Sequence, residues 1–215
     1  MDSKPPKSVV KRDPEGTRRR ILEAAKSQFA KFGLAGARTD AIAEVAGSNE
    51  RMLYYYFGSK ELLYVAVLEA MYADYAKKES ELDLSGLEPR EAMAALATSI
   101  WVHLWDNPEW LGLINNENLH QGRYLKTSEK VTETISPVID VVGSILERGV
   151  DAGQFRSGID PLDFYVTVVG MGYYIASNRF TISAFTGRDY ARQSDRAKIC
   201  ELHLEILDAY LRSTT

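Results

Sequence analysis

Apolar residues recur at helical spacing along most of the chain. Near the N-terminus they fall on one face of a helix at Ile21, Leu22, Ala25, Phe29 and Phe32. Asp13 and Pro14 precede this pattern as a capping acid and a proline at the first helical position. Gly33 follows it, and a glycine at that place is typical of a helix end. The pattern therefore predicts a first helix over residues 14–32.

Two short helices are predicted next, each between a capping residue and a glycine. We expect Thr39 to cap a helix that Gly47 ends, and Asn49 to cap a helix over residues 50–57 that Gly58 ends. Longer amphipathic patterns predict further helices over residues 59–82, 89–105, 108–114, 135–150, 161–185 and 192–211. Residues 83–89 form a loop and a candidate hinge, whereas residues 121–133 fit no clear pattern. The sequence therefore predicts an all-α fold of about nine helices.

The composition narrows the class of protein. Of the 215 residues, 45% are hydrophobic, which is enough for a packed core. A single cysteine, Cys200, excludes an internal disulfide framework and suits a reducing compartment. No apolar run approaches the ~20 residues of a membrane helix, and residues 1–12 resemble a disordered basic tail and not a secretory signal. We therefore expect a cytoplasmic protein that has no membrane partner.

Charge is distributed unevenly along the chain. Residues 1–60 hold 12 Lys or Arg and 7 Asp or Glu, although the whole chain has a net charge of −4. A basic end on an acidic body is expected where that end meets a polyanion, while a solvated basic tail would give the same count.

The predicted helices on either side of Gly47 have the spacing of a helix-turn-helix, because only Ser48 and Asn49 separate that glycine from the next helix. On a helical wheel the second helix has two faces. Glu50, Arg51, Tyr54 and Tyr55 gather on one face, and Met52, Leu53, Tyr56 and Phe57 gather on the other. The first face suits a major groove and its phosphates, and the second suits packing on neighbouring helices. An ordinary amphipathic surface helix is the alternative.

Cations at two predicted helix starts favour nucleic acid. Arg18, Arg19 and Arg20 lie near the start of the first helix, and Lys60 begins the helix after Gly58. Cations there oppose the helix dipole at a cost of ~0.3–1 kcal/mol each. A phosphate docked on those helix ends would reverse that effect.

The sequence here resembles the TetR family of bacterial transcriptional regulators. The match is carried by TDAIAEVAG over residues 39–47 and LYYYFGSKELL over residues 53–63, and it extends over roughly residues 14–68. The resemblance implies a helix-turn-helix DNA-binding domain over residues 13–58. It also implies a helical regulatory and dimerisation domain over residues 59–215, with residues 59–82 as the connecting helix. One departure is Ser48, where the family usually has an apolar residue.

The resemblance and the local chemistry together give a set of candidate DNA-binding residues. These are Arg18, Arg38, Thr39, Asn49, Glu50, Arg51, Tyr54, Tyr55 and Lys60. The resemblance implies that Thr39 and Lys60 bind phosphates, that Tyr54 contacts the DNA backbone, and that residues 49–51 and Tyr55 face base edges. The side-chain chemistry suits Arg51 to guanine and Asn49 to adenine. Glu50 either accepts a hydrogen bond from cytosine or orients Arg51.

The last two helices, over about residues 162–186 and 192–211, are the predicted homodimer interface. The penultimate helix is apolar nearly all round, which predicts burial on most faces. The last helix carries two apolar stripes, and we expect one to serve its own core and the other a partner subunit. Its stripes are Ile199, Leu202, Ile206 and Tyr210, and Cys200, Leu204, Leu207 and Leu211. In the alternative, both stripes pack within one subunit.

A pocket for an unknown small-molecule effector is expected in the C-terminal domain, where aromatic residues lie among polar ones. The candidates are Trp101, Trp105, Trp110, Asn116, Tyr165, Tyr173, Tyr174 and Asn178. Plain core packing is the alternative for each aromatic residue. A second alternative to a pocket is a buried polar network in which Glu117 pairs with Arg179.

The expected function is a ligand-responsive repressor that binds a palindromic operator in double-stranded DNA as a homodimer, with no catalytic residues, cofactor or metal. An activator of the same fold is the alternative. A di-iron bundle enzyme would use Glu117 and His120, which form one Glu-x-x-His motif. Such a site needs a second Glu-x-x-His motif, and the sequence has none. A helical adaptor that binds only protein would leave Arg51 and Lys60 unexplained.

Overall fold

The structure is a computed structural model that describes residues 13–212; the basic segment 1–12 lies outside the described residues. Its elements are α1 (Pro14–Gly36), α2 (Thr39–Val45), α3 (Glu50–Phe57), α4 (Lys60–Ser80), α5 (Pro89–Asp106), α6 (Pro108–Leu119), the 3-10 turn η1 (Leu125–Thr127), α7 (Glu129–Asp151), α8 (Pro161–Thr186) and α9 (Gln193–Leu211). Between residues 13 and 212 there are nine α-helices and no β-strand, which confirms the predicted all-α fold. None of these helices is long and apolar enough to cross a membrane.

Four predicted helix starts are confirmed by their caps. The side chains of Asp13, Asn49, Ser59 and Asp160 each accept a hydrogen bond from a backbone N–H in the first turn of the helix that follows. The prediction that Thr39 caps α2 is wrong. Thr39 is the first residue of α2, and its hydroxyl donates instead to a side chain of α3.

Other predicted boundaries also differ, and α6 continues to Leu119, past residue 114. Gly33 has a positive φ of 68°, as a helix-ending glycine should, but one more helical turn follows and α1 ends at Gly36. The kink lets Asn116 of α6 approach, since its side-chain oxygen would lie 2.5 Å from a Cβ at position 33. The unclear stretch 121–133 contains η1 and the first turn of α7, so α7 begins at Glu129 and not at residue 135 as predicted.

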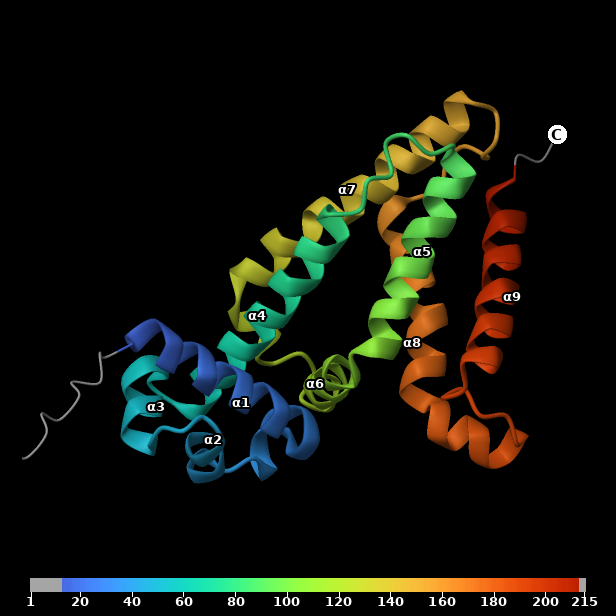
Figure 1. Ribbon diagram of the computed structural model, residues 1–215. Coiled ribbons are helices and arrows are strands. Elements are labelled where there is room, and N and C mark those ends of the chain that lie inside the picture. Colours follow the sequence, from blue (N-terminus) through green and yellow to red (C-terminus); the bar gives the residue numbers. More distant parts are fainter. Residues whose placement is uncertain (1–12, 213–215) are drawn as a thin grey trace, which may run out of the picture.

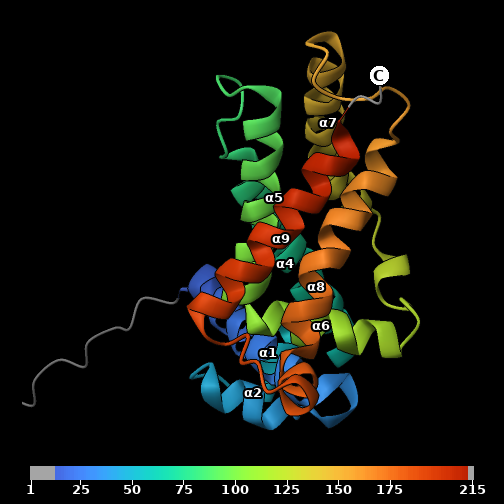
Figure 2. The same cartoon turned by 90° about the vertical axis from the view of Figure 1, so that its right-hand side faces the viewer.

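The helices form a small head and a longer body (Figure 1). α1, α2 and α3 make the head at one end, and α4 leads from it into the body, where it packs against α7. α5 lies against α7, α8 and α9, and α6 lies between the head and the rest of the body. Figure 2 shows α8 and α9 side by side on one outer side of the molecule.

Head and body share one hydrophobic core, because α1 packs on both α4 and α6. Phe29 of α1 meets Tyr64 of α4 edge to face, with ring centroids 5.1 Å apart. Gly112 of α6 lies so close to α1 that an added Cβ would come within 2.5 Å of the Ala30 carbonyl oxygen. The lack of a side chain at position 112 therefore sets the distance between the two helices.

The apolar helix α8 is buried on one side only in the single chain. Phe164, Val168 and Ala176 are buried, whereas Phe180 is 72% exposed and Tyr174 is 58% exposed. The prediction of burial on most faces is therefore wrong for one subunit by itself.

Replacing Gly112 by alanine should loosen the head–body junction. The added methyl group has to push α6 away from the Ala30 backbone, so we expect the free energy of unfolding to fall by ~1–3 kcal/mol, as in overpacked cores. Urea titration followed by circular dichroism measures the loss. Asn118→Ala, at an exposed position of the same helix, is the matched control and should change little. An unchanged unfolding midpoint for Gly112→Ala would contradict the close approach.

Candidate nucleic-acid interface and cavity

Helix α3 has one face in the core and one face in solvent. Leu53 and Phe57 are buried against the other head helices, whereas the Tyr54 and Tyr55 side chains are 46% and 76% exposed. Arg51 is exposed on the same side as the tyrosines. The predicted division of α3 into a packing face and a free face is confirmed.

The turn before α3 is held by short-range hydrogen bonds. Gly47 has a φ of 59°, a conformation that favours glycine. The N–H of Ser48 donates to the Ala43 carbonyl at 2.9 Å, and the side chain of Asn49 accepts from the N–H of Met52 at 3.1 Å. Ser48 thus closes the turn through its backbone even though it lacks the family's apolar side chain.

A hydrogen bond across the turn joins α2 to α3. The Thr39 hydroxyl donates to a carboxylate oxygen of Glu50 at 2.5 Å. Glu50 is therefore engaged with Thr39, and the expectation that it orients Arg51 is wrong for the free protein. The bond helps to fix the direction of α3 relative to α2, and Arg51 takes no part in it.

Several predicted DNA-binding cations already have partners within the head. Arg18 lies over the Phe57 ring, 5.0 Å from its centroid, and Arg38 forms an exposed ion pair with Asp40. That guanidinium hydrogen bond is the largest cause of a lowered Asp40 pKa. Lys60 lies 3.5 Å from the Ala35 carbonyl oxygen. These cations are at the surface, so the internal contacts position them without burying their charge.

A groove lies between the start of α1 and the free face of α3. It has a volume of about 630 Å³ and is lined by Thr17, Asn49, Arg51 and Tyr55, among others. Three of the predicted base-facing residues therefore lie together beside the first turn of α1.

The eight predicted pocket residues do not surround one cavity. Trp101 is wholly buried and donates its indole N–H to the Val168 carbonyl at 2.8 Å, whereas Tyr174 points largely to solvent. Asn116 bonds the Gly112 carbonyl beside Gly33, and the Asn178 amide bonds the Tyr174 carbonyl. The placement of Tyr174, Asn116 and Asn178 in a single pocket is wrong, because the rotation of each helix turns these residues to different surroundings.

The remaining pocket candidates also lie apart from one another. Trp105 is half-buried, with the Arg196 guanidinium 4.8 Å above it. The hydroxyl of Tyr173 donates to Asn115, which also bonds Ser177 and so joins α6 to α8. Tyr165 and Trp110 belong to the interior cluster described below.

Glu117 has a structural role that the sequence did not predict. It is buried, and one of its carboxylate oxygens accepts the N–H groups of both Tyr124 and Leu125, at 2.8 and 2.9 Å. Arg179 bonds the Ala176 carbonyl instead, so the expected Glu117–Arg179 pair is wrong. Across residues 13–212 no three His, Cys, Asp or Glu side chains gather as a metal site would require.

An interior cluster of aromatic and titratable residues lies where α4, α5 and α6 meet. Tyr75 packs against both His103 and Trp110, and its hydroxyl lies 3.3 Å from that of Tyr165. Burial, followed by the charges of Lys78 and Lys26, lowers the pKa of His103 to about 4. The ring is therefore neutral at pH 7.

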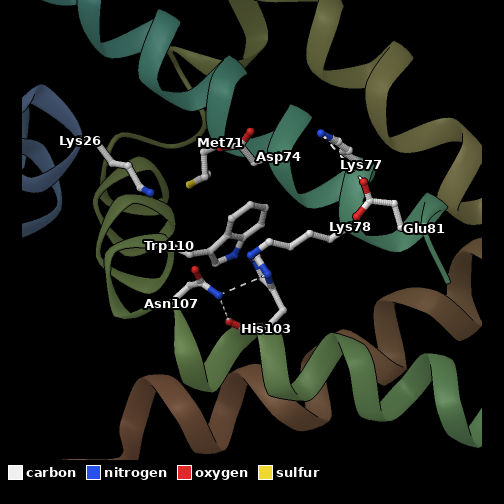
Figure 3. Close-up of a pocket in the computed structure, with 9 residues that line it drawn as sticks. All are labelled: Lys26, Met71, Asp74, Lys77, Lys78, Glu81, His103, Asn107 and Trp110. Carbon is white, nitrogen blue, oxygen red and sulfur yellow. Dashed lines mark hydrogen bonds and ion pairs between the residues drawn. The ribbon is translucent and has the colours of Figure 1, made fainter. Parts of the chain in front are cut away.

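Beside this cluster lies a cavity of about 290 Å³ (Figure 3). Trp110, the one predicted pocket residue that lines it, is joined there by His103, Asn107 and three lysines, Lys26, Lys77 and Lys78. The lysines were not among the predicted residues. Lys26 gives a signal in the sequence, since it lies between Leu22 and Phe29 at helical spacing on the inner side of α1.

Comparison with known families bears on both parts of the chain. Residues 21–67 match the model described as "Bacterial regulatory proteins, tetR family". Residues 89–206, more than half of the chain, match the model described as "Tetracyclin repressor-like, C-terminal domain". The chain belongs to the TetR family of bacterial regulators. The turn at Gly47 and the helices α2 and α3 on either side of it lie within the residues that the N-terminal model matches.

The similarity to two curated relatives extends beyond the head. The chain is 37% identical to the HTH-type transcriptional repressor NicS of Pseudomonas putida over 181 residues, which is 84% of this chain and 85% of the relative. It is 30% identical to the repressor KstR2 of Rhodococcus jostii over 159 residues, 73% of this chain and 76% of that one.

Solved structures are similar along nearly the whole chain. A putative transcriptional regulator, SCO4942 of Streptomyces coelicolor, is 25% identical with a TM-score of 0.67, covering 88% of this chain and 97% of its own. FadR of Bacillus subtilis, solved in complex with stearoyl-CoA, is 18% identical with a TM-score of 0.66, covering 90% and 99%. The second likeness supports the fold alone.

Glu79 gives a test of the interior. It is buried, Ser99 donates to one of its oxygens at 3.1 Å, and burial raises its pKa to about 6. Because the folded pKa exceeds the unfolded value of about 4.5, the stability present below pH 4.5 is lost as the pH rises through 6. Glu79→Gln should remove this loss, so it should stabilise the protein by up to ~2 kcal/mol at pH 8 and far less at pH 4.5.

Urea unfolding of both proteins at the two pH values, at one protein concentration, measures the difference. Glu147→Gln, at an exposed position of α7, is the control and should show no such pH dependence. Equal effects of Glu79→Gln at both pH values would contradict the raised pKa.

Proposed function

We propose that the protein is a transcriptional repressor that binds a palindromic operator as a homodimer and releases it when a small molecule binds the body. NicS and KstR2 are both named as repressors, which favours repression over activation. The observation that carries DNA binding is the free face of α3, where Arg51 and Tyr55 are exposed opposite the buried Leu53 and Phe57.

The chemistry of that face suits a major groove. Arg51 carries a planar pair of donors that match the acceptors of guanine, and the Tyr54 hydroxyl suits a phosphate oxygen. Asn49 already caps α3 with its side-chain oxygen, so its amide group is the part left for an adenine or a phosphate. Thr39 and Lys60 flank this face, and both have polar atoms suited to the DNA backbone.

Dimerisation through α8 and α9 is supported by the apolar side chains that one subunit leaves uncovered. On the outer side of these helices they are Leu162, Val166, Tyr174, Phe180, Phe185, Leu202, Ile206 and Tyr210. On α9, Leu207 and Leu211 pack inward while Leu202 and Ile206 face outward, which is the division expected if one stripe serves a partner. A contiguous apolar surface of this kind is typical of a permanent interface.

Two-fold symmetry about that surface would present two copies of α3 to one side of a DNA duplex. Half-sites of a palindrome are read when the recognition helices lie about 34–36 Å apart or at a multiple of that spacing. We propose that a ligand alters this spacing, because α4 connects the head to the body through one continuous helix. A coupling of ~1–3 kcal/mol is sufficient for such regulation.

Removing the side chains of Arg51 and Tyr55 should weaken operator binding. With a DNA fragment selected from genomic DNA by the purified protein, we expect Arg51→Ala combined with Tyr55→Ala to weaken binding by at least about tenfold, since one good base contact contributes ~1–3 kcal/mol. Fluorescence anisotropy at several salt concentrations measures both affinity and its salt dependence. Arg123→Ala, an exposed arginine outside the head, is the control. Undiminished affinity of the double variant would overturn the proposed reading face.

A charge on the uncovered apolar surface should separate the subunits. We expect Phe180→Asp to shift the protein towards monomer in analytical ultracentrifugation, because a carboxylate at an apolar interface is costly to bury. Leu119→Asp is the matched control, since Leu119 on α6 is 82% exposed but lies outside α8 and α9. A Phe180→Asp variant that remains as dimeric as the control would place the interface elsewhere.

A further inference from the structure

The cavity of about 290 Å³ is built from both the head and the body (Figure 3). Lys26 comes from α1 and Lys78 from α4, while His103 comes from α5 and Trp110 from α6. Nothing in the proposed DNA contacts uses these four residues. A molecule bound among them would touch the head and the body at once.

The hydrogen bonds around His103 indicate which ring nitrogen carries the hydrogen of the neutral imidazole. The Asn107 amide nitrogen donates one hydrogen to the His103 carbonyl at 2.8 Å and lies 3.3 Å from the ring nitrogen Nδ1. An amide nitrogen is only a donor, so Nδ1 accepts and the neutral ring carries its hydrogen on Nε2. Nε2 is buried and has no partner among the described residues. A buried N–H left in this way is an unused donor, and leaving it unpaired costs ~1–3 kcal/mol.

Positive charge accompanies that donor. Lys78 forms no ion pair with any described residue, and Figure 3 shows its side chain extending across to the His103 ring. Lys26 points into the same space, and its ammonium group forms an ion pair with Glu109, 3.5 Å away. Lys77, Asp74 and Glu81 also line the cavity; Lys77 and Glu81 pair with each other, and Asp74 is the lining carboxylate that has no ion pair among the described residues.

We propose that this cavity binds a small organic carboxylate on a compact apolar body, and that this anion is the effector. The carboxylate accepts from the ammonium groups of Lys78 and Lys26, and from Nε2 of His103 once the Lys78 side chain, which extends across to the ring, moves aside. The apolar body lies against Trp110 and Met71, which line the same cavity. The inference rests on the proposed function only in calling the anion an effector; the binding site stands on the cavity itself.

The size of the cavity limits the ligand. A volume of about 290 Å³ lies at the lower end of small-molecule pockets, which run from ~300 to 1,000 Å³. A single ring with a carboxylate fits such a space.

Binding would act on the head through Lys26. A ligand carboxylate competes with Glu109 for the Lys26 ammonium group, and Glu109 lies in the first turn of α6. α1 and α6 pack closely at Gly112, so weakening their ion pair changes how the head sits on the body. The ligand then has different affinities for two arrangements of the dimer, which is what regulation requires.

The test uses benzoate and its uncharged counterpart benzamide on the full-length protein. Tryptophan labelled with ¹⁵N gives one indole signal for each of Trp101, Trp105 and Trp110, and a Trp110→Phe variant assigns the third. We expect benzoate to shift the Trp110 signal in a saturable way, with benzamide and acetate each binding at least about tenfold more weakly. Lys78→Met should weaken benzoate by a similar factor, whereas Lys126→Met, an exposed lysine of η1, should not.

Several results would overturn the site. These are no response of Trp110 to benzoate, equal responses to benzoate and benzamide, and unchanged benzoate binding by Lys78→Met. Acetate or inorganic phosphate binding as tightly as benzoate would also overturn it, because a plain ion site needs no apolar wall. Saturating benzoate should in addition lower affinity for the selected DNA fragment at least about fivefold. If benzoate binds but DNA affinity does not change, the site stands and its effector role is wrong, while DNA binding itself is measured separately.

Discussion

The packing of α1 against α4 and α6 is the constraint on which the rest of the molecule depends. Phe29 and Tyr64 meet edge to face there, and Gly112 lets α6 approach the backbone of Ala30. A head of three helices, two of them short, buries little apolar surface by itself, so it gains much of its core from the body. The same sharing means that any change in the body is felt by α1, and through α1 by the helix-turn-helix.

Some polar side chains of the head fix the direction of α3, and others remain free to contact a partner. Asn49 caps the helix, Thr39 holds Glu50, and Arg18 lies over Phe57. These contacts are short-range and fix the direction of α3 at small cost. Arg51 and Tyr55 make no hydrogen bond within the described head, so they keep their donors for a ligand. A surface that reads DNA needs both properties, since free groups on a loosely held helix would lose binding energy to ordering.

The body has two features that a single chain leaves incomplete. One is the apolar outer side of α8 and α9, which is costly to expose to water. The other is the interior cluster, where Glu79 and the His103 Nε2 are buried with unused hydrogen-bonding capacity. A stable monomer would be expected to avoid both. A second subunit would cover the first feature, and a small anion would satisfy the histidine.

The sequence by itself determined the local structure. Capping residues such as Asn49, positive-φ glycines such as Gly47, and the 3.6-residue period fixed the helices and the two faces of α3, because these signals act within a few residues. The tertiary structure alone decided which side chains meet from different helices. In the folded chain Tyr174 faces solvent and Glu117 accepts hydrogen bonds from the loop after α6. Lys26 and His103 line the same cavity. Such contacts depend on the rotation and approach of whole helices, which no local pattern specifies.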